Sequence, residues 1–133
     1  MRRSNQGFTL IEVMIVIAII GLVVTLSLPS ITEYVKKTHR TQIAGLLSEQ
    51  AQSLERFHSK GGVYSNAPGL SAGNDDYSIA PVLADQSFTL TATPKSDGMM
   101  AGDKCGEFTL SHTGAMGNNN LADGVTSQEC WGR

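Results

Sequence analysis

An apolar segment near the start of the chain, Phe8 to Leu28, constrains the fold more than any other feature of the sequence. At a rise of about 1.5 Å per residue, a helix of this length is about 31 Å long, close to the hydrocarbon thickness of a bilayer. One carboxylate, that of Glu12, lies inside the segment. We therefore expect a membrane-spanning helix that carries the rest of the chain.

The residues before this segment predict its orientation. Arg2 and Arg3 lie just ahead of it, and basic residues hold that end of a span in the cytoplasm, so the chain beyond Pro29 is expected outside. A cleaved secretory signal peptide is the alternative. Against it, the apolar run is longer than the usual core of such a signal, and no Ala-x-Ala-like cleavage site follows it. The sequence therefore favours a segment that is retained.

Glu12 needs either a positively charged partner or access to the polar headgroups, because a carboxylate at the centre of the hydrocarbon costs about 2.5–3.5 kcal/mol. It can reach the cytoplasmic headgroups, or it can pair with a positive charge. Phe8 lies four residues earlier, so a cut between Gly7 and Phe8 would create an amine within one helical turn of Glu12. That amine could belong to the same chain or to a neighbour. Gly7 has no side chain to obstruct a peptidase, which is typical of a processing site.

The combination of a short basic leader, the stretch GFTLIEV and an apolar helix resembles the N-terminus of type IV prepilins. The resemblance implies cleavage after Gly7 by a prepilin peptidase, N-methylation of Phe8, and assembly through a contact of Glu12 with the N-terminal amine of a neighbouring subunit. It also implies unwinding between Gly21 and Pro29 in the filament. This stretch is also expected to be a weak part of the helix, because Pro29 lacks an N–H. A static kink is the alternative to unwinding.

From Ser30 onward the apolar residues recur at helical spacing, which predicts an amphipathic helix of residues 30–60 that Gly61-Gly62 ends. A coiled coil is disfavoured because Gln42, Gly45 and Gln50 interrupt the heptads. The stripe is expected to lie on a globular head, with the charged residues mostly off it. The stripe comprises Ile31, Tyr34, Val35, Thr38, Ile43, Leu46, Leu47, Ala51, Leu54 and Phe57, and the charged residues are Lys36, Lys37, Arg40, Glu49, Glu55 and Arg56.

After a loop at 61–76, three stretches predict short antiparallel strands: Tyr77–Leu83, Phe88–Thr93 and Glu107–His112. Pro81 places the first at a sheet edge. A fourth strand would come from 113–132, with Trp131 as its best apolar anchor, although 117–120 is a polar run that we expect to be a loop. Cys105 and Cys130 enclose that region, and a disulfide suits it better than a metal or redox pair, because there is no CxxC and His39, His58 and His112 lack ligand spacing.

The head extends the resemblance. ERF at 55–57, YSIA at 77–80, FTLTATP at 88–94, DKCGEFTL at 103–110 and CWGR at 130–133 are similar to small pilins of the PilE minor-pilin group. The fold implied is α+β: a long N-terminal helix packed on an antiparallel sheet of three to four strands, with a C-terminal disulfide-bounded loop. The expected parts are a cleaved leader (1–7), a transmembrane assembly helix (8–29), an amphipathic helix (30–60), and a loop, sheet and disulfide-bounded loop (61–133).

We accordingly expect a structural subunit of a type IV pilus, a minor pilin, and not an enzyme. Its carboxylates at Asp75, Asp76, Asp97 and Asp103 are interpreted as solvated loop residues, and no metal or cofactor is expected. The expected partners are the prepilin peptidase, major and minor pilin subunits, the inner-membrane assembly machinery, and lipid before assembly. The location is the inner membrane, with the N-terminus cytoplasmic, and then the extracellular pilus.

Two alternatives stay open. One is a pilus-associated binding module, an adhesin or a DNA-uptake pilin that uses the Cys105–Cys130 loop; the other is a type II secretion pseudopilin. Nucleic acid is not expected as a partner, because 61–133 has three basic and eight acidic residues. A group of basic residues on the helix could bind nucleic acid instead: Lys36, Lys37 and Arg40. This group is expected to lie near the membrane, where anionic lipid is the simpler partner.

Overall fold

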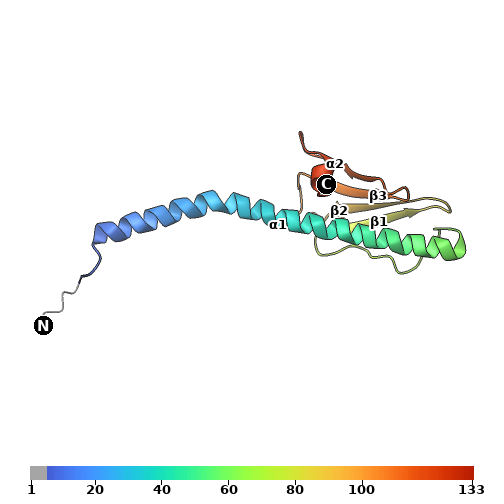
Figure 1. Ribbon diagram of the computed structural model, residues 1–133, viewed down its shortest axis with the longest axis horizontal. Coiled ribbons are helices and arrows are strands. Elements are labelled where there is room, and N and C mark those ends of the chain that lie inside the picture. The colour runs from blue at the N-terminus through green and yellow to red at the C-terminus, as the bar shows by residue number, and fades with distance from the viewer. Residues whose placement is uncertain (1–5) are drawn as a thin grey trace. The chain divides into compact units, whose positions relative to one another are not determined.

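The computed structural model describes residues 6–133 (Figure 1), so Arg2 and Arg3 lie outside the described residues. The chain forms two compact units that meet between Val35 and Lys36, and each is described by itself. The elements in chain order are α1 (Leu10–Gly61), β1 (Tyr77–Leu83), β2 (Phe88–Pro94), β3 (Glu107–Ser111), β4 (Met116–Asn119) and α2 (Ser127–Cys130).

Helix α1 runs as 52 residues of α-helix and continues through Pro29. In its apolar part, each of three hydroxyls donates a hydrogen bond to a carbonyl of the preceding turn: Thr25 to Leu22, Ser27 to Val23 and Thr32 to Leu28. These hydroxyls therefore need no water, which suits a segment surrounded by lipid. The helix ends as predicted, at Gly61, and Gly62 follows with a φ of +77°.

The four strands form one antiparallel sheet in the order β1-β2-β3-β4. The three predicted strands are confirmed, with β2 extended by one residue to Pro94 and β3 ending one residue earlier, at Ser111. Pro81 lies in β1, at the edge of the sheet, where a residue without an N–H costs no ladder bond.

The fourth strand, β4, comes from the region where it was expected, but the prediction that 117–120 is a loop was wrong. Gly117 and Asn118 pair with Thr109 and Phe108 of β3. Polar contacts replace the apolar content that the sequence lacks: the Trp131 indole donates to the Gly117 carbonyl at 3.1 Å, and the Asn118 amide donates to the Cys105 carbonyl at 3.0 Å. Trp131 thus anchors β4 from outside the strand.

The core of the second unit lies between α1 and one face of the sheet. From α1 it receives Ile43, Leu47 and Leu54, as the stripe predicted. The stripe is wrong at its start, because Ile31 and Tyr34 remain 56% and 73% exposed and lie before the unit that contains the core. The core residues are Ile43, Leu47, Leu54, Tyr64, Tyr77, Ile79, Phe88, Leu90, Ala92, Met100, Cys105, Phe108, Leu110 and Cys130.

Candidate functional site

The N-terminal segment brings Phe8 and Glu12 together. Both line one hollow of about 220 Å³, with Val13 and Val16 as its other lining residues. Phe8 is 84% exposed, and α1 begins two residues later. The structure thus places the predicted processing site and the predicted assembly carboxylate side by side.

Thr9 is a residue of this segment that the sequence analysis missed. It lies just before α1, and its Oγ1 accepts a hydrogen bond from the Glu12 N–H at 3.2 Å, which satisfies one of the donors left free at the helix start. The sequence signal for this cap is the Thr-x-x-Glu pattern of Thr9 to Glu12, ahead of an apolar run. Because the cap uses the Glu12 backbone, it leaves the carboxylate available.

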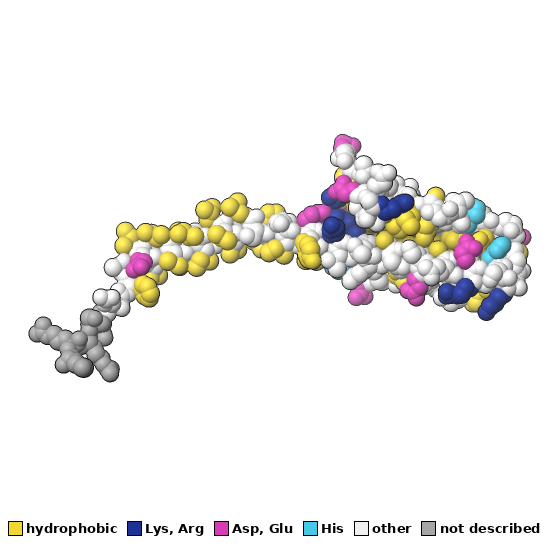
Figure 2. All heavy atoms as spheres, in the orientation of Figure 1, with side chains coloured by type: hydrophobic (Ala, Val, Ile, Leu, Met, Phe, Trp, Pro, Cys, Tyr) yellow, Lys and Arg dark blue, Asp and Glu magenta, His cyan; other side chains and the backbone are white. Residues whose placement is uncertain are grey.

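The first half of α1, up to Pro29, has an exposed apolar surface that no residue in the described part of the chain covers. Hydrophobic side chains cover this part of the helix in Figure 2, and α1 contains a segment with a mean hydropathy of 2.7, none of it buried, that is long and apolar enough to cross a membrane. Gly21 lies in this segment in open space. Such a surface requires lipid or other apolar surfaces around it.

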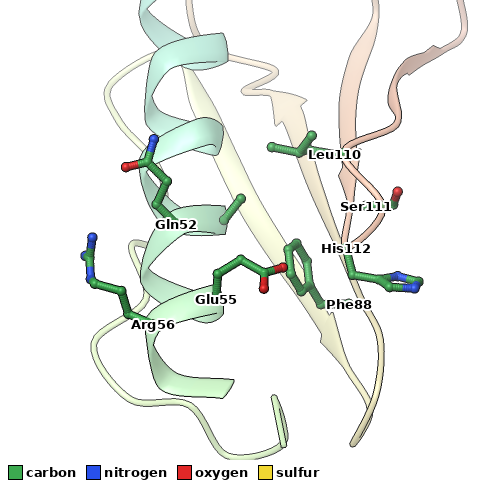
Figure 3. Close-up of a pocket in the computed structure, with 9 residues that line it drawn as sticks. Gln52, Glu55, Arg56, Phe88, Leu110, Ser111 and His112 are labelled. Atoms are coloured by element: carbon green, nitrogen blue, oxygen red, sulfur yellow. The ribbon is translucent and has the colours of Figure 1, made fainter. Parts of the chain in front are cut away.

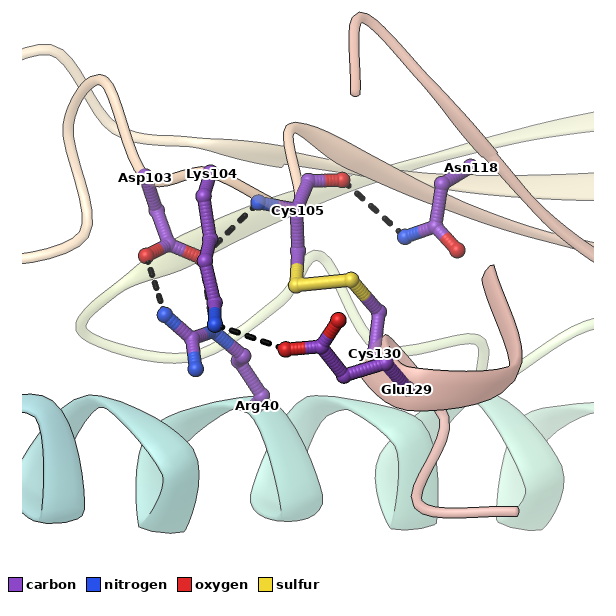
Figure 4. Close-up of polar contacts among 7 residues, drawn as sticks. All are labelled: Arg40, Asp103, Lys104, Cys105, Asn118, Glu129 and Cys130. Atoms are coloured by element: carbon purple, nitrogen blue, oxygen red, sulfur yellow. Dashed lines mark hydrogen bonds and ion pairs between the residues drawn. A yellow bond between two sulfur atoms is a disulfide. The ribbon is translucent and has the colours of Figure 1, made fainter. Parts of the chain in front are cut away.

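In the second unit, Arg40 of α1 makes a two-point ion pair with Asp103, which lies between β2 and β3 (Figure 4). Arg40 Nε donates to Oδ2 at 2.8 Å and Nη2 donates to Oδ1 at 2.6 Å, and the two side chains are 6% and 1% exposed. Burial by itself would raise the pKa of the Asp103 carboxyl, but the hydrogen bonds and charge of Arg40 outweigh it, so the pKa is lowered.

This pair corrects two predictions. Arg40 was expected off the packed stripe, and Asp103 was expected to be a solvated loop residue. Asp76 was expected to be solvated too, but it is mostly buried and contacts His39 Nδ1 through Oδ2 at 2.5 Å. Helical spacing puts Arg40 on the same face of α1 as Ile43 and Leu47. It was expected off the stripe because of its charge, and the spacing carries no information about the carboxylate 63 residues away that pairs with it.

The disulfide predicted between Cys105 and Cys130 is confirmed. It joins the turn just before β3 to the end of α2, and the Lys104 Nζ lies 2.8 Å from Glu129 Oε1 beside it (Figure 4). Asp103 Oδ2 accepts a hydrogen bond from the Cys105 N–H at 3.3 Å. The Arg40–Asp103 pair therefore connects α1 directly to the residue that starts the disulfide-bounded region.

A hollow of about 400 Å³ lies between α1 and the sheet (Figure 3). Phe88, Leu110 and Ala51 supply apolar lining, and Glu55 points toward it while accepting a hydrogen bond from the Tyr64 hydroxyl at 2.9 Å. The His112 ring points away from α1. Among residues 6–133, no group of three or more His, Cys, Asp or Glu side chains could hold a metal ion.

Two family models match the sequence. One is described as "Type IV minor pilin ComP, DNA uptake sequence receptor" and matches residues 29–109; the other, "Prokaryotic N-terminal methylation motif", matches residues 2–28. Fimbrial protein EcpC of Eikenella corrodens is 32% identical in an alignment that covers 98% of this chain and 84% of that protein. The type IV major alpha-pilin of Moraxella bovis is 31% identical, with coverages of 95% and 79%.

Solved structures agree with these matches. A type IV pilin from Shewanella oneidensis superposes with a TM-score of 0.53 at 29% identity and covers 61% of this chain and 89% of its own. The minor pilin PilV of Neisseria meningitidis gives a TM-score of 0.52 at 22% identity, with coverages of 65% and 94%, which is a likeness of fold. Together with the long apolar helix, the four-stranded sheet and the methylation motif, these relatives show that the chain belongs to the type IV pilin family.

Proposed function

We propose that this pilin is a minor subunit of a type IV pilus, cleaved after Gly7, N-methylated on Phe8, held in the inner membrane, and assembled through the first half of α1. The observation that carries the proposal is the uncovered apolar surface of that half, with Glu12 as the carboxylate near its start. In a filament, the apolar helices of neighbouring subunits replace lipid around this surface. A contact of Glu12 with the N-terminal amine of a neighbouring subunit would then favour one register of the docked helices.

Intact-mass spectrometry of the mature protein tests the processing. The expected mass is that of Phe8–Arg133 with one added methyl group and a closed Cys105–Cys130 disulfide. A mass that retains residues 1–7 would contradict cleavage after Gly7. Recovery of the chain from sheared surface filaments would support a pilus subunit, and its confinement to the cell envelope would favour a pseudopilin. Its abundance in those filaments, relative to the other subunits, tests the minor role.

Glu12→Ala tests assembly. We expect membrane insertion to persist, because removing a charge makes the segment more apolar, while incorporation into filaments falls sharply. The matched control is Val16→Ala, which truncates a side chain of the same hollow without touching a charge. Filament incorporation is measured by immunoblot of sheared material against the membrane fraction. Normal incorporation of Glu12→Ala, or an equal defect in both variants, would contradict the role of Glu12.

A DNA-uptake role is the second candidate, and the family model that matches residues 29–109 favours it. It runs against the expectation drawn from the acidic distal region. Anisotropy of a labelled DNA duplex, titrated with the full chain in a non-ionic detergent, tests this candidate. An absence of binding at low salt would remove it and would leave the pilus-subunit proposal intact.

A further inference from the structure

A second hollow in the head, of about 230 Å³, is lined by the last turns of α1 and by the segment that follows. Its lining residues are Ser53, Arg56, Phe57, Lys60 and Pro68. The lining contains two cations and no carboxylate, unlike the disulfide region, where the cations of Arg40 and Lys104 are paired with carboxylates. This composition suits an anion.

Arg56 and Lys60 are available to such an anion. Both are exposed, and their side chains form no hydrogen bond or ion pair within the part of the chain that the structure describes. They lie one helical turn apart, about 6 Å along the axis, so they are neighbours on one face of α1. On the face of the head seen in Figure 2, basic side chains gather near the end of α1.

Ser53 adds an uncharged donor to the same face. The hydroxyls of Ser48 and Ser59 donate to the α1 carbonyls of Ala44 and Arg56, as is common in helices. The Ser53 hydroxyl makes no such bond with any described residue, although it lines the hollow. Phe57, partly buried, supplies an aromatic surface beside the two cations.

The nearest acidic groups on α1 weaken the attraction of an anion to Arg56 and Lys60 but do not cancel it. Glu49 is exposed one turn before Ser53 on the same side of the helix. Glu55 points to the opposite side of α1 from Arg56 (Figure 3), where it binds the Tyr64 hydroxyl. The charge of Lys60 also interacts favourably with the partial negative charge at the C-terminus of α1. That interaction would be purely structural and would not involve Arg56 or Ser53.

We propose that Arg56, Lys60 and Ser53 form a binding site for the phosphate backbone of nucleic acid. The site rests on the DNA-binding candidate above and specifies where that contact is made. The planar guanidinium and the ammonium form charge-assisted hydrogen bonds with phosphate oxygens.

The test compares Arg56→Gln/Lys60→Gln with a matched control, Lys37→Gln/Lys95→Gln, that removes the same charge elsewhere in the head. Each full chain, in a non-ionic detergent, is titrated against a labelled DNA duplex over a series of salt concentrations. Each phosphate neutralised contributes about 0.9 to the slope of log affinity against log salt. We expect the slope of the first variant to fall by about 1–2 and its low-salt affinity to drop at least about tenfold, equally for any sequence. The control should change by less than about threefold.

The outcomes separate the two proposals. If the wild-type chain binds DNA and Arg56→Gln/Lys60→Gln keeps the same affinity and slope, the site is wrong and the DNA-binding candidate stands. If the control loses affinity and the first variant does not, the contact lies elsewhere on the head. If the wild-type chain does not bind DNA at low salt, both the DNA-binding candidate and the proposed phosphate site are wrong. If DNA binding is unchanged and filament incorporation falls, the hollow receives an acidic group of a neighbouring subunit instead.

Discussion

The buried pair of Arg40 and Asp103 makes the sharpest prediction about the stability of the head. Arg40→Met keeps most of the side-chain volume but removes both hydrogen bonds, at 2.8 and 2.6 Å, and leaves the Asp103 carboxylate 1% exposed without its cation. Removing one partner of a buried pair costs about 3–5 kcal/mol, because the other charge is left desolvated. That is a large share of the roughly 5–15 kcal/mol that stabilises a domain.

The loss depends on pH in a defined direction. In the wild type, the lowered pKa of Asp103 contributes stability above the carboxyl pKa of the unfolded chain, about 3.9, and this contribution is lost as the pH falls through the folded pKa. In Arg40→Met, burial raises the pKa of Asp103, so acid relieves the cost by protonating the carboxyl. The difference in unfolding free energy between the two proteins should therefore be largest near neutral pH and shrink in acid. Lys36 and Tyr77, the other groups that interact electrostatically with Asp103, are present in both.

Urea denaturation followed by the fluorescence of Trp131, the only tryptophan of the chain, measures this loss in the head. Trp131 packs edge-on against Phe108, with ring centroids 5.3 Å apart, so its emission reports the unfolding of the core. With a slope of about 1–3 kcal/mol per M of urea, the expected loss moves the midpoint by at least about 1 M. Lys37→Met, which removes an exposed charge from the same helix, should stay within about 0.5 kcal/mol of the wild type.

Arg40→Met/Asp103→Leu provides the decisive comparison, because it removes both charges and leaves neither one buried alone. It should be clearly more stable than Arg40→Met, since replacing a buried pair by apolar side chains is often neutral. Arg40→Lys keeps the charge and loses the two-point geometry, so its unfolding free energy should lie between those of the two variants. It replaces Arg40→Met in the comparison if Arg40→Met does not fold. A loss below about 1 kcal/mol for Arg40→Met, or a loss that is the same at acid and neutral pH, would refute the reasoning.

Two further predictions concern the disulfide-bounded region. Cys105→Ser/Cys130→Ser should lower the unfolding free energy by about 3–4 kcal/mol, as expected for a sequence separation of 25, and urea denaturation with and without reductant checks this. Gly106→Ala should cost at least about 2 kcal/mol, because φ is +57° and a Cβ would lie 2.2 Å from the Asn119 carbonyl oxygen; Gly114→Ala, with φ of +79° and open space around it, should cost only about 1 kcal/mol. Equal losses at the two glycines would contradict the steric argument.

Much of the fold follows from local sequence patterns. Alternating residues predicted three strands within one residue at each end, Pro81 identified an edge strand, and Gly61-Gly62 marked the end of the helix. These features are predictable because each depends on the chemistry of a few neighbouring residues. The two cysteines were predicted to pair because no other partner chemistry suited them.

The features that sequence reasoning missed depend on distant partners. Strand β4 has no apolar alternation, and it is held by the indole of Trp131 and by the amide of Asn118. Arg40 is buried because Asp103 reaches it. Gln50, interpreted as a polar interruption of the heptads, is buried because its Oε1 accepts a hydrogen bond from the Ser71 N–H at 2.7 Å. Helical spacing puts Arg40 and Gln50 on the buried face of α1, but it cannot indicate which distant groups they bind. The cap made by Thr9 depends only on neighbouring residues, so it could have been predicted.

The contrast between the two halves of α1 strengthens the case for Glu12. In the second half, Arg40 and Gln50 find partners in the loops of the head. In the first half, the hydroxyls of Thr25 and Ser27 bond to their own helix, so they require nothing from outside. The Glu12 carboxylate does neither, since it forms no hydrogen bond or ion pair with any residue in 6–133. A carboxylate at the start of an apolar helix without an internal partner favours one from elsewhere, and the amine that cleavage after Gly7 would create, in this chain or a neighbour, has the charge and the position to supply it.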